Sequence, residues 1–277
     1  MGLGLVGAGL LAAGAWGGVP SAPTPPSAVA IRPAVLRNFT ADQAALRRYR
    51  YRERVILVKG GSRTDRTLSV YYVQGRSVAP EIALDGQPLG PRGRAAQQQA
   101  ARERAAQLAH RPPPPLGVVD FRGHDYSFPR LAADFHYGPA RVVIWHGRTT
   151  WVYPAWPNPN APHPSSAEKV LLASRGTVWI DAKDLHLVRV QMHTFRPVRY
   201  LAGILATVHR ATLDLQLQRV APGVWLPART AFRLRATLLL LKAFNESKVE
   251  SYWAYHRGTG PGPQAADGTR SIVKGVN

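Results

Sequence analysis

The feature that most constrains the fold of this chain is a period of two in hydrophobicity that returns in segment after segment, with turn residues between the segments. In GTVWIDAKDLHLVRVQMH, Val178 and Ile180 alternate with Thr177, Trp179 and Asp181. The turn DAKD follows, in which the first aspartate can accept a hydrogen bond from the backbone two residues further on. The alternation then resumes, so the segment predicts an antiparallel hairpin with one buried face. Its second half is expected to bury Val188, Val190 and Met192.

The same period marks strands along most of the chain. A short helix over about 41–48, begun by a capping box of Thr40 and Gln43, is expected to lead into a strand from Tyr49, with further strands at 67–74 and 77–84. Later strands place apolar side chains on a shared face, namely Leu213, Leu215 and Leu217, then Phe232 and Leu234, and finally Val249, Trp253 and Tyr255. Strand, turn and strand with one apolar face predict a large antiparallel sheet that curves around something.

Residues from about 86 to 115 interrupt the sheet. They contain helix formers, five Arg against one Glu, and four consecutive prolines at the end. A helix that is polar all round is exposed or marginally stable, so we expect an exposed and mobile helical insert rather than a domain boundary. One domain is therefore expected over 31–257, followed by a disordered tail at 258–277.

The first 30 residues predict an export signal. Residues 1–19 are uncharged and apolar, and Ala28-Val29-Ala30 offers the small residues of a cleavage site. The Lys or Arg that usually precedes such a run is missing, and an uncleaved anchor is the alternative. The expected location is the periplasm or cell envelope.

The charge of the chain is strongly positive. It has 36 Lys and Arg against 16 Asp and Glu, a formal net charge of +20. This balance favours an anionic partner such as nucleic acid, anionic lipid or an acidic polymer, and the alternative is that the arginines cover solvated strand faces. Arg50, Arg52 and Arg54 share a strand face, but no nucleic-acid-binding motif accompanies them, so nucleic acid is not expected as a partner.

The sequence contains no recognisable catalytic constellation. The absence of cysteine excludes disulfides, a thiolate nucleophile and cysteine-ligated zinc. The nine histidines are dispersed without an H-E-x-x-H motif, and ASRG at 173–176 lacks the first glycine of a nucleophile elbow. Four carboxylates lie in turns or on polar strand faces and are expected to be solvated: Asp181, Asp184, Asp214 and Glu250. We expect no catalytic residue, no metal and no cofactor.

The order of the motifs resembles a known family. YRYRERV, LDGQPLGP, GRTTWVYPAWPNP, the hairpin GTVWIDAKDLHLVRVQ, LDLQLQRVAPGVWLPARTAFRLRA and SKVESYWAYHR follow one another between Phe39 and Arg257. This series resembles exported bacterial proteins related to the outer-membrane lipoprotein-sorting (LolA/LolB-like) superfamily, which also includes a periplasmic anti-sigma-factor regulator. The resemblance implies an α+β, mostly β fold, an open half-barrel whose concave face is plugged by short helices and can hold acyl chains. Its W-I-D and W-L-P turns correspond to 179–181 and 225–227.

The leading hypothesis is a non-catalytic envelope protein that binds a lipid or lipoprotein acyl chains in an apolar hollow. The expected lining residues are Leu213, Leu215, Leu217, Phe232, Leu234 and Trp253. For any one of them, a place in an ordinary filled core is the alternative. The other hypotheses are a regulatory or interaction module that binds another envelope protein, a protein that binds an anionic membrane surface through its arginines, and, last, an enzyme.

Overall fold

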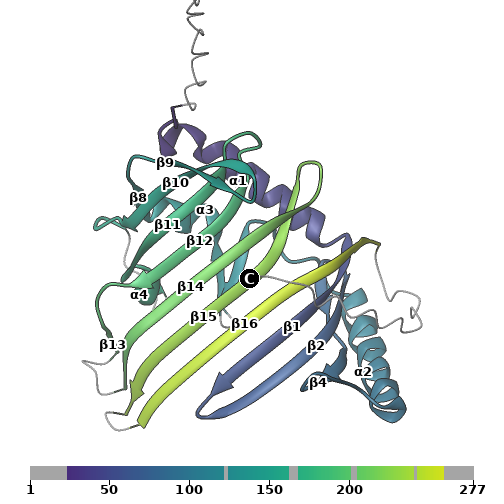
Figure 1. Ribbon diagram of the computed structural model, residues 1–277. Coiled ribbons are helices and arrows are strands. Elements are labelled where there is room, and N and C mark those ends of the chain that lie inside the picture. The colour runs from purple at the N-terminus through teal and green to yellow at the C-terminus, as the bar shows by residue number, and fades with distance from the viewer. Residues whose placement is uncertain (1–23, 122–123, 162–167, 201–204, 240–241, 259–277) are drawn as a thin grey trace, which may run out of the picture.

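Most of the structure is one open antiparallel sheet. The computed structural model describes residues 24–121, 124–161, 168–200, 205–239 and 242–258. The sheet has 14 strands in the order β5-β4-β2-β1-β16-β15-β14-β12-β11-β10-β8, and β3, β9 and β13 pair beside this path. The outer strands β5 and β8 do not pair with each other, so the sheet does not close. The predicted fold class, mostly β with an open antiparallel sheet and a few helices, is confirmed (Figure 1).

The elements alternate regularly along the chain. The strands of the sheet are β1 (Tyr49–Lys59), β2 (Ser62–Val73), β3 (Arg76–Val78), β4 (Glu81–Leu84), β5 (Gln87–Pro88), β8 (Phe135–Tyr137), β9 (Arg141–Trp145), β10 (Arg148–Pro157), β11 (Ser174–Asp181), β12 (Leu187–Thr194), β13 (Val198–Tyr200), β14 (Ala206–Ala221), β15 (Val224–Leu238) and β16 (Lys242–Arg257). A separate two-stranded sheet is formed by β6 (Val118–Phe121) and β7 (His124–Ser127). The helices are α1 (Ala28–Leu46), α2 (Pro91–Ala109), α3 (Phe128–Ala133) and α4 (Glu168–Leu171). The expected strand at 67–74 begins earlier, and the one at 77–84 is divided between β3 and β4.

Helix α1 covers one face of the sheet, which we call the concave face, and it is longer than predicted. It begins after Ser27, whose Oγ accepts a hydrogen bond from the N–H of Ala30. The expected capping box is wrong, because the Thr40 hydroxyl donates to the carbonyl of Leu36 and the Gln43 side chain accepts from Gly117. An apolar stripe at a spacing of four extends the helix towards the N-terminus, since packing on the sheet stabilises those turns: Ile31, Val35 and Phe39.

The first turn of α1 contains the expected cleavage site. Residues 28–30 are helical, and Pro26 just before them accepts a hydrogen bond from the Tyr153 hydroxyl at 2.9 Å. Cleavage near residue 30 stays a prediction. The apolar leader at 1–19 and the tail from 259 onwards lie outside the described residues.

The hairpin at 176–193 forms as predicted, with β11 antiparallel to β12. The turn also forms as expected, because Asp181 Oδ1 accepts from the N–H groups of Lys183 and Asp184 at 3.1 and 2.8 Å. A bulge between Trp179 and Ile180 shifts the register, and as a result Leu187, not Val188, joins Val190 on the concave face. The two strands also approach closely at Gly176, where a Cβ atom would lie 1.8 Å from the carbonyl oxygen of Gln191.

A second bulge changes the last strand. The pairing of β1 with β16 shifts between Arg50 and Arg52, and Ala254 has a φ of +54°. The rings of Tyr252 and Tyr255 therefore both lie on Tyr51, with centroids 6.0 and 5.1 Å away. The prediction that Trp253 and Tyr255 share a face is wrong, because the extra residue reverses the alternation between them.

The insert contains the expected helix, α2, and most of its side chains are exposed. It is nevertheless attached to the sheet, since Leu108 is completely buried and Ala101 nearly so, against Tyr71 and Val78. Figure 1 shows α2 beside β4 at the edge of the molecule. The mobility of the insert stays a prediction.

Candidate functional site

An apolar cavity of about 360 Å³ lies between the concave face and the helices α1 and α3. One side of α1, with residues three or four apart, lines it, and strands β8, β10, β11, β12, β14 and β15 supply the opposite wall. The lining from the sheet is Phe135, Tyr137, Tyr153, Ala155, Val178, Ile180, Leu187, Val190, Met192, Leu213, Leu215, Leu217, Leu226 and Pro227. The lining is nearly all hydrocarbon because each strand turns its apolar set inwards, as the period of two requires.

The six residues predicted as lining separate into three groups. Leu213, Leu215 and Leu217 of β14 line the cavity as a row. Phe232 and Leu234 belong to a neighbouring apolar cluster with Val198, Val208 and Ala236, further along the same sheet. Trp253 is 38% exposed and does not line the cavity, because it pairs with Arg52 and points to the face opposite to that of its neighbour Tyr252.

The sequence reasoning missed the wall made by the helices. Val35 and Phe39 of α1 and Phe128 and Leu131 of α3 line the cavity, and the rings of Phe39 and Phe128 stack at 3.9 Å. A search for the period of two cannot find these residues. The spacing of four in α1 carried the signal for Val35 and Phe39.

The space between the helices and the sheet is not filled by side chains. Leu187 and Ile180 are each only 2% exposed, as in a closed core. Val190, Leu213 and Leu215 point to the same side yet are only partly buried. A packed interior leaves few voids larger than a water molecule, so this half of the concave face forms a hollow next to a closed core.

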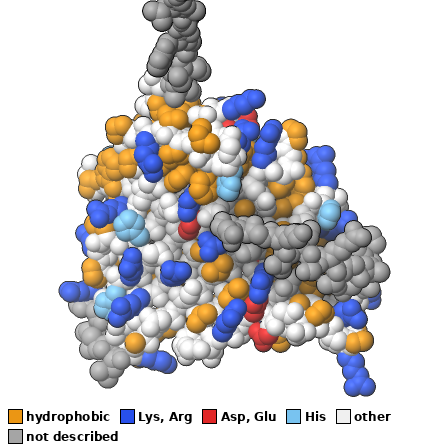
Figure 2. Space-filling view, viewed as in Figure 1, with side chains coloured by type: hydrophobic (Ala, Val, Ile, Leu, Met, Phe, Trp, Pro, Cys, Tyr) orange, Lys and Arg blue, Asp and Glu red, His pale blue; other side chains and the backbone are white. Residues whose placement is uncertain are grey.

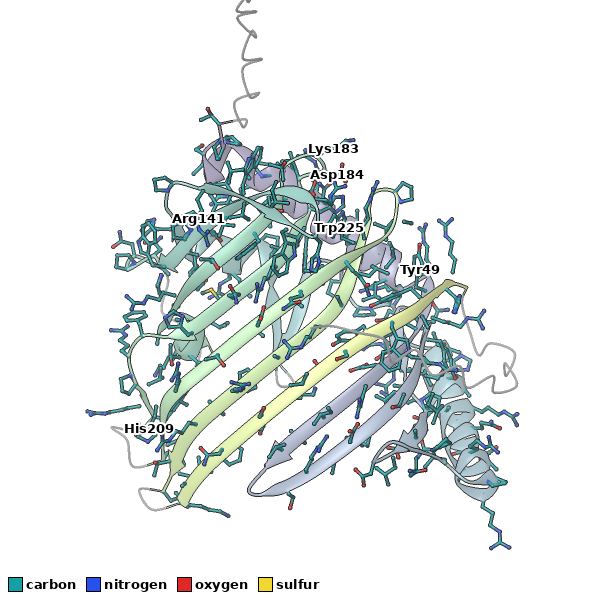
Figure 3. All side chains as sticks on the ribbon, viewed as in Figure 1. Tyr49, Arg141, Lys183, Asp184, His209 and Trp225 are labelled. Atoms are coloured by element: carbon teal, nitrogen blue, oxygen red, sulfur yellow. The ribbon has the colours of Figure 1, made fainter. Side chains whose placement is uncertain are left out.

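Polar groups hold α1 over the hollow. Asp42, only 5% exposed, accepts a hydrogen bond from the N–H of Trp225 at 2.9 Å, and its other oxygen lies 2.7 Å from His186 Nδ1. One turn earlier, the Asn38 amide donates to the carbonyls of Asp184 and Leu185. Figure 3 shows Asp184 and Trp225 at the same end of the sheet. The helix is therefore attached at two of its turns.

A buried ion pair stabilises the turn that anchors Asn38. Asp181 is 1% exposed, and its two oxygens accept from Arg148 at 2.5 and 2.9 Å. Burial alone would raise the pKa of the Asp181 carboxyl, but the hydrogen bonds from Arg148 and from the turn backbone hold the pKa below its usual value. The expectation that Asp181 is solvated is wrong, because Arg148 and the turn replace the water.

The other three carboxylates also have partners. Asp184 pairs with Arg148, and Asp214 pairs with Arg189. Glu250 pairs with Lys248 and accepts a hydrogen bond from the Tyr252 hydroxyl.

In the part of the chain that the structure describes, no three His, Cys, Asp or Glu side chains are placed to hold a metal ion. No described helix is long and apolar enough to cross a membrane.

Comparisons with known proteins find likenesses among solved structures, all at low identity. No family model and no curated protein sequence matches this chain. Among solved structures, it is similar to a DUF1329 family protein from Desulfovibrio piger, with 12% identity, a TM-score of 0.33, and coverage of 83% of this chain and 94% of the other. An outer membrane lipoprotein-sorting protein domain from Vibrio parahaemolyticus has 11% identity, a TM-score of 0.33 and the same coverage. A structure of the MucA/MucB complex of Pseudomonas aeruginosa follows, with 8% identity, a TM-score of 0.25 and coverage of 82% and 99%. Because these identities and TM-scores are low, the likenesses carry no functional argument, and the cavity carries it instead.

Proposed function

We propose that this chain is a non-catalytic cell-envelope protein that binds a lipid, or the acyl chains of a lipoprotein, in the cavity between α1, α3 and the concave face. The observation that carries the proposal is the row of partly buried apolar side chains on that face, Val190, Leu213 and Leu215, which face open space although a helix covers them. Export through residues 1–30 belongs to the same proposal, because it would deliver the protein to the envelope.

The chemistry of the cavity fits a hydrocarbon chain. Its volume of about 360 Å³ lies within the roughly 300–1,000 Å³ that small-molecule sites occupy. An acyl chain needs no directed hydrogen bond, and its binding is driven by the removal of apolar surface from water. Asp42, the one carboxylate in the lining, already has two partners, so it does not require a polar ligand.

A charge introduced at Leu215 tests the proposal. The full-length protein would be titrated with a fluorescent fatty acid, and Leu215→Glu should weaken its binding at least tenfold while circular dichroism shows a folded protein. The new carboxylate can stay hydrated in an accessible hollow, whereas a closed core would have to desolvate it. Leu217, two residues along the same strand, also lines the cavity but is buried in the neighbouring core, so Leu217→Glu should fail to fold. Leu84→Glu, on a leucine that is 42% exposed in β4, is the control and should bind the probe normally.

The outcomes separate a hollow from a core. If Leu215→Glu fails to fold, as Leu217→Glu does, the space is a core and the proposal is wrong. If it folds and binds the probe as tightly as the unmodified protein, the ligand site is not this cavity. Leu213→Trp is a second, uncharged variant, and by filling the space it should lower affinity more for long acyl chains than for short ones.

A further inference from the structure

A second groove lies at the end of the sheet far from the anchor of α1. It has a volume of about 730 Å³ and is lined by two exposed aromatic rings and four cations, Trp156, Phe195, Lys169, Arg175, Arg196 and Arg199. The side chains come from the end of β10, from α4, from the start of β11 and from the segment around β13, which lie along the left side of Figure 1. The guanidinium groups of Arg175 and Arg196 lie 5.9 and 5.5 Å from the centre of the Phe195 ring.

The four cations of this groove have no acidic partner among the side chains that the structure describes. None of those carboxylates lies within ion-pair distance of the four, and none lines the groove. In contrast, Arg54, Arg148 and Arg189 elsewhere on the sheet each pair with an aspartate. Figure 2 shows Lys and Arg side chains along this side of the molecule, with few acidic ones. Unpaired cations this close together produce a local positive potential that favours an anionic partner.

Exposed apolar side chains continue this edge beyond Arg199, since β13 pairs Tyr200 with Ala206 at the start of β14. Leu239 and Leu205 are 67% and 49% exposed, and the N–H of Leu239 donates to the carbonyl of Leu205 at 3.0 Å. They lie where β14 begins and β15 ends, near His209 in Figure 3. Leu239 also has a φ of +48°. A left-handed backbone is costly for a leucine, and glycine or asparagine would ordinarily relieve it, so an exposed leucine there indicates a role for its side chain.

We propose that this end of the sheet docks on an anionic lipid bilayer. We call it the basic edge, comprising the groove together with Leu205 and Leu239. The interface of a membrane accepts aromatic, cationic and aliphatic side chains together. Aromatic rings lie at the level of the headgroups, arginines pair with the phosphates, and leucines enter the boundary of the acyl chains. A nucleic acid would account for the arginines and rings but offers no hydrocarbon layer to the leucines. The lipid bilayer is therefore the partner that fits the whole edge.

Vesicle sedimentation of the full-length protein tests the proposal. Binding to phosphatidylglycerol vesicles is expected, and binding to pure phosphatidylcholine should be much weaker. Each Lys or Arg near an anionic surface strengthens binding about fivefold. The triple variant Arg175→Gln, Arg196→Gln and Arg199→Gln should therefore bind about a hundredfold more weakly. The matched control changes three exposed arginines of α2 and loses the same net charge, namely Arg92→Gln, Arg94→Gln and Arg104→Gln, and it should bind almost as well as the unmodified protein.

Two further variants, each of which replaces an exposed apolar residue by aspartate, test the role of the leucines. Leu239→Asp should weaken vesicle binding at least tenfold, whereas Ile144→Asp, on a residue that is 69% exposed in β9, should not. Both variants should keep their affinity for the fluorescent fatty acid, so this result is independent of the proposed acyl site. Equal losses of vesicle affinity in the two triple arginine variants would show that net charge alone attracts the vesicles and would overturn the proposal. So would a Leu239→Asp protein that binds vesicles normally.

Discussion

Replacing Asp42 by alanine should destabilise the protein more than its single side chain suggests. The carboxylate is almost completely buried and contacts two segments at once, the backbone N–H of Trp225 at the start of β15 and the ring of His186 just before β12. Alanine would leave both partners in an environment that water barely reaches. Each buried polar group without a partner costs about 1–3 kcal/mol, so the free energy of unfolding should fall by about 2–5 kcal/mol. That is a large share of the roughly 5–15 kcal/mol that stabilises a typical domain.

Urea unfolding followed by tryptophan fluorescence would measure the loss. With a slope of about 2–3 kcal/mol per molar urea, the midpoint should fall by about 1–2 M. Arg37→Ala, an exposed position on the same helix, is the control and should change stability by less than about 0.5 kcal/mol. Asp42→Asn should lie between the two, because its carbonyl oxygen can still accept from the N–H of Trp225. A loss of under about 0.5 kcal/mol in Asp42→Ala would refute the view that this carboxylate anchors α1.

Two further predictions concern Glu53 in β1 and the helix α2 of the insert. Burial, and then the nearby Glu250, raise the pKa of Glu53 from 4.5 to about 7. The folded state therefore favours the neutral acid, and the associated stability is complete below pH 4.5 and lost as the pH rises to 7. Glu53→Gln should be about 1–3 kcal/mol more stable than the unmodified protein at pH 8, and no more stable at pH 4; urea titrations that show the same difference at both pH values would contradict this. In the insert, Leu108→Asp should detach α2 from the sheet. Trypsin should then cut sooner at the arginines of the insert, which are Arg92, Arg94, Arg102, Arg104 and Arg111. The control Ala106→Asp, on the exposed side of α2, should not speed the cleavage, and first cuts within the strands would count against a mobile insert.

The strands and their inward faces could be predicted because the signal is local. A side chain in a strand points opposite to its neighbour, so the alternation of Leu213, Leu215 and Leu217 is sufficient to place all three on one face. The same rule failed where a bulge inserted one residue, at Val188 in β12 and between Trp253 and Tyr255 in β16. A bulge depends on the partner strand, and one sequence segment read alone does not reveal it.

The hollow could not be predicted in the same way. The alternation shows that Leu215 faces inwards, but whether it meets a packed side chain or open space depends on where α1 lies. That position is set by contacts between residues more than a hundred apart in the chain, such as Asp42 with His186 and Asn38 with Asp184. The sequence by itself determined a large antiparallel sheet with one apolar face, because strand periodicity is a property of neighbouring residues. The tertiary structure alone decided that helices cover this face without filling it and that unpaired cations and exposed leucines gather at one edge, because both depend on which distant segments the fold brings together.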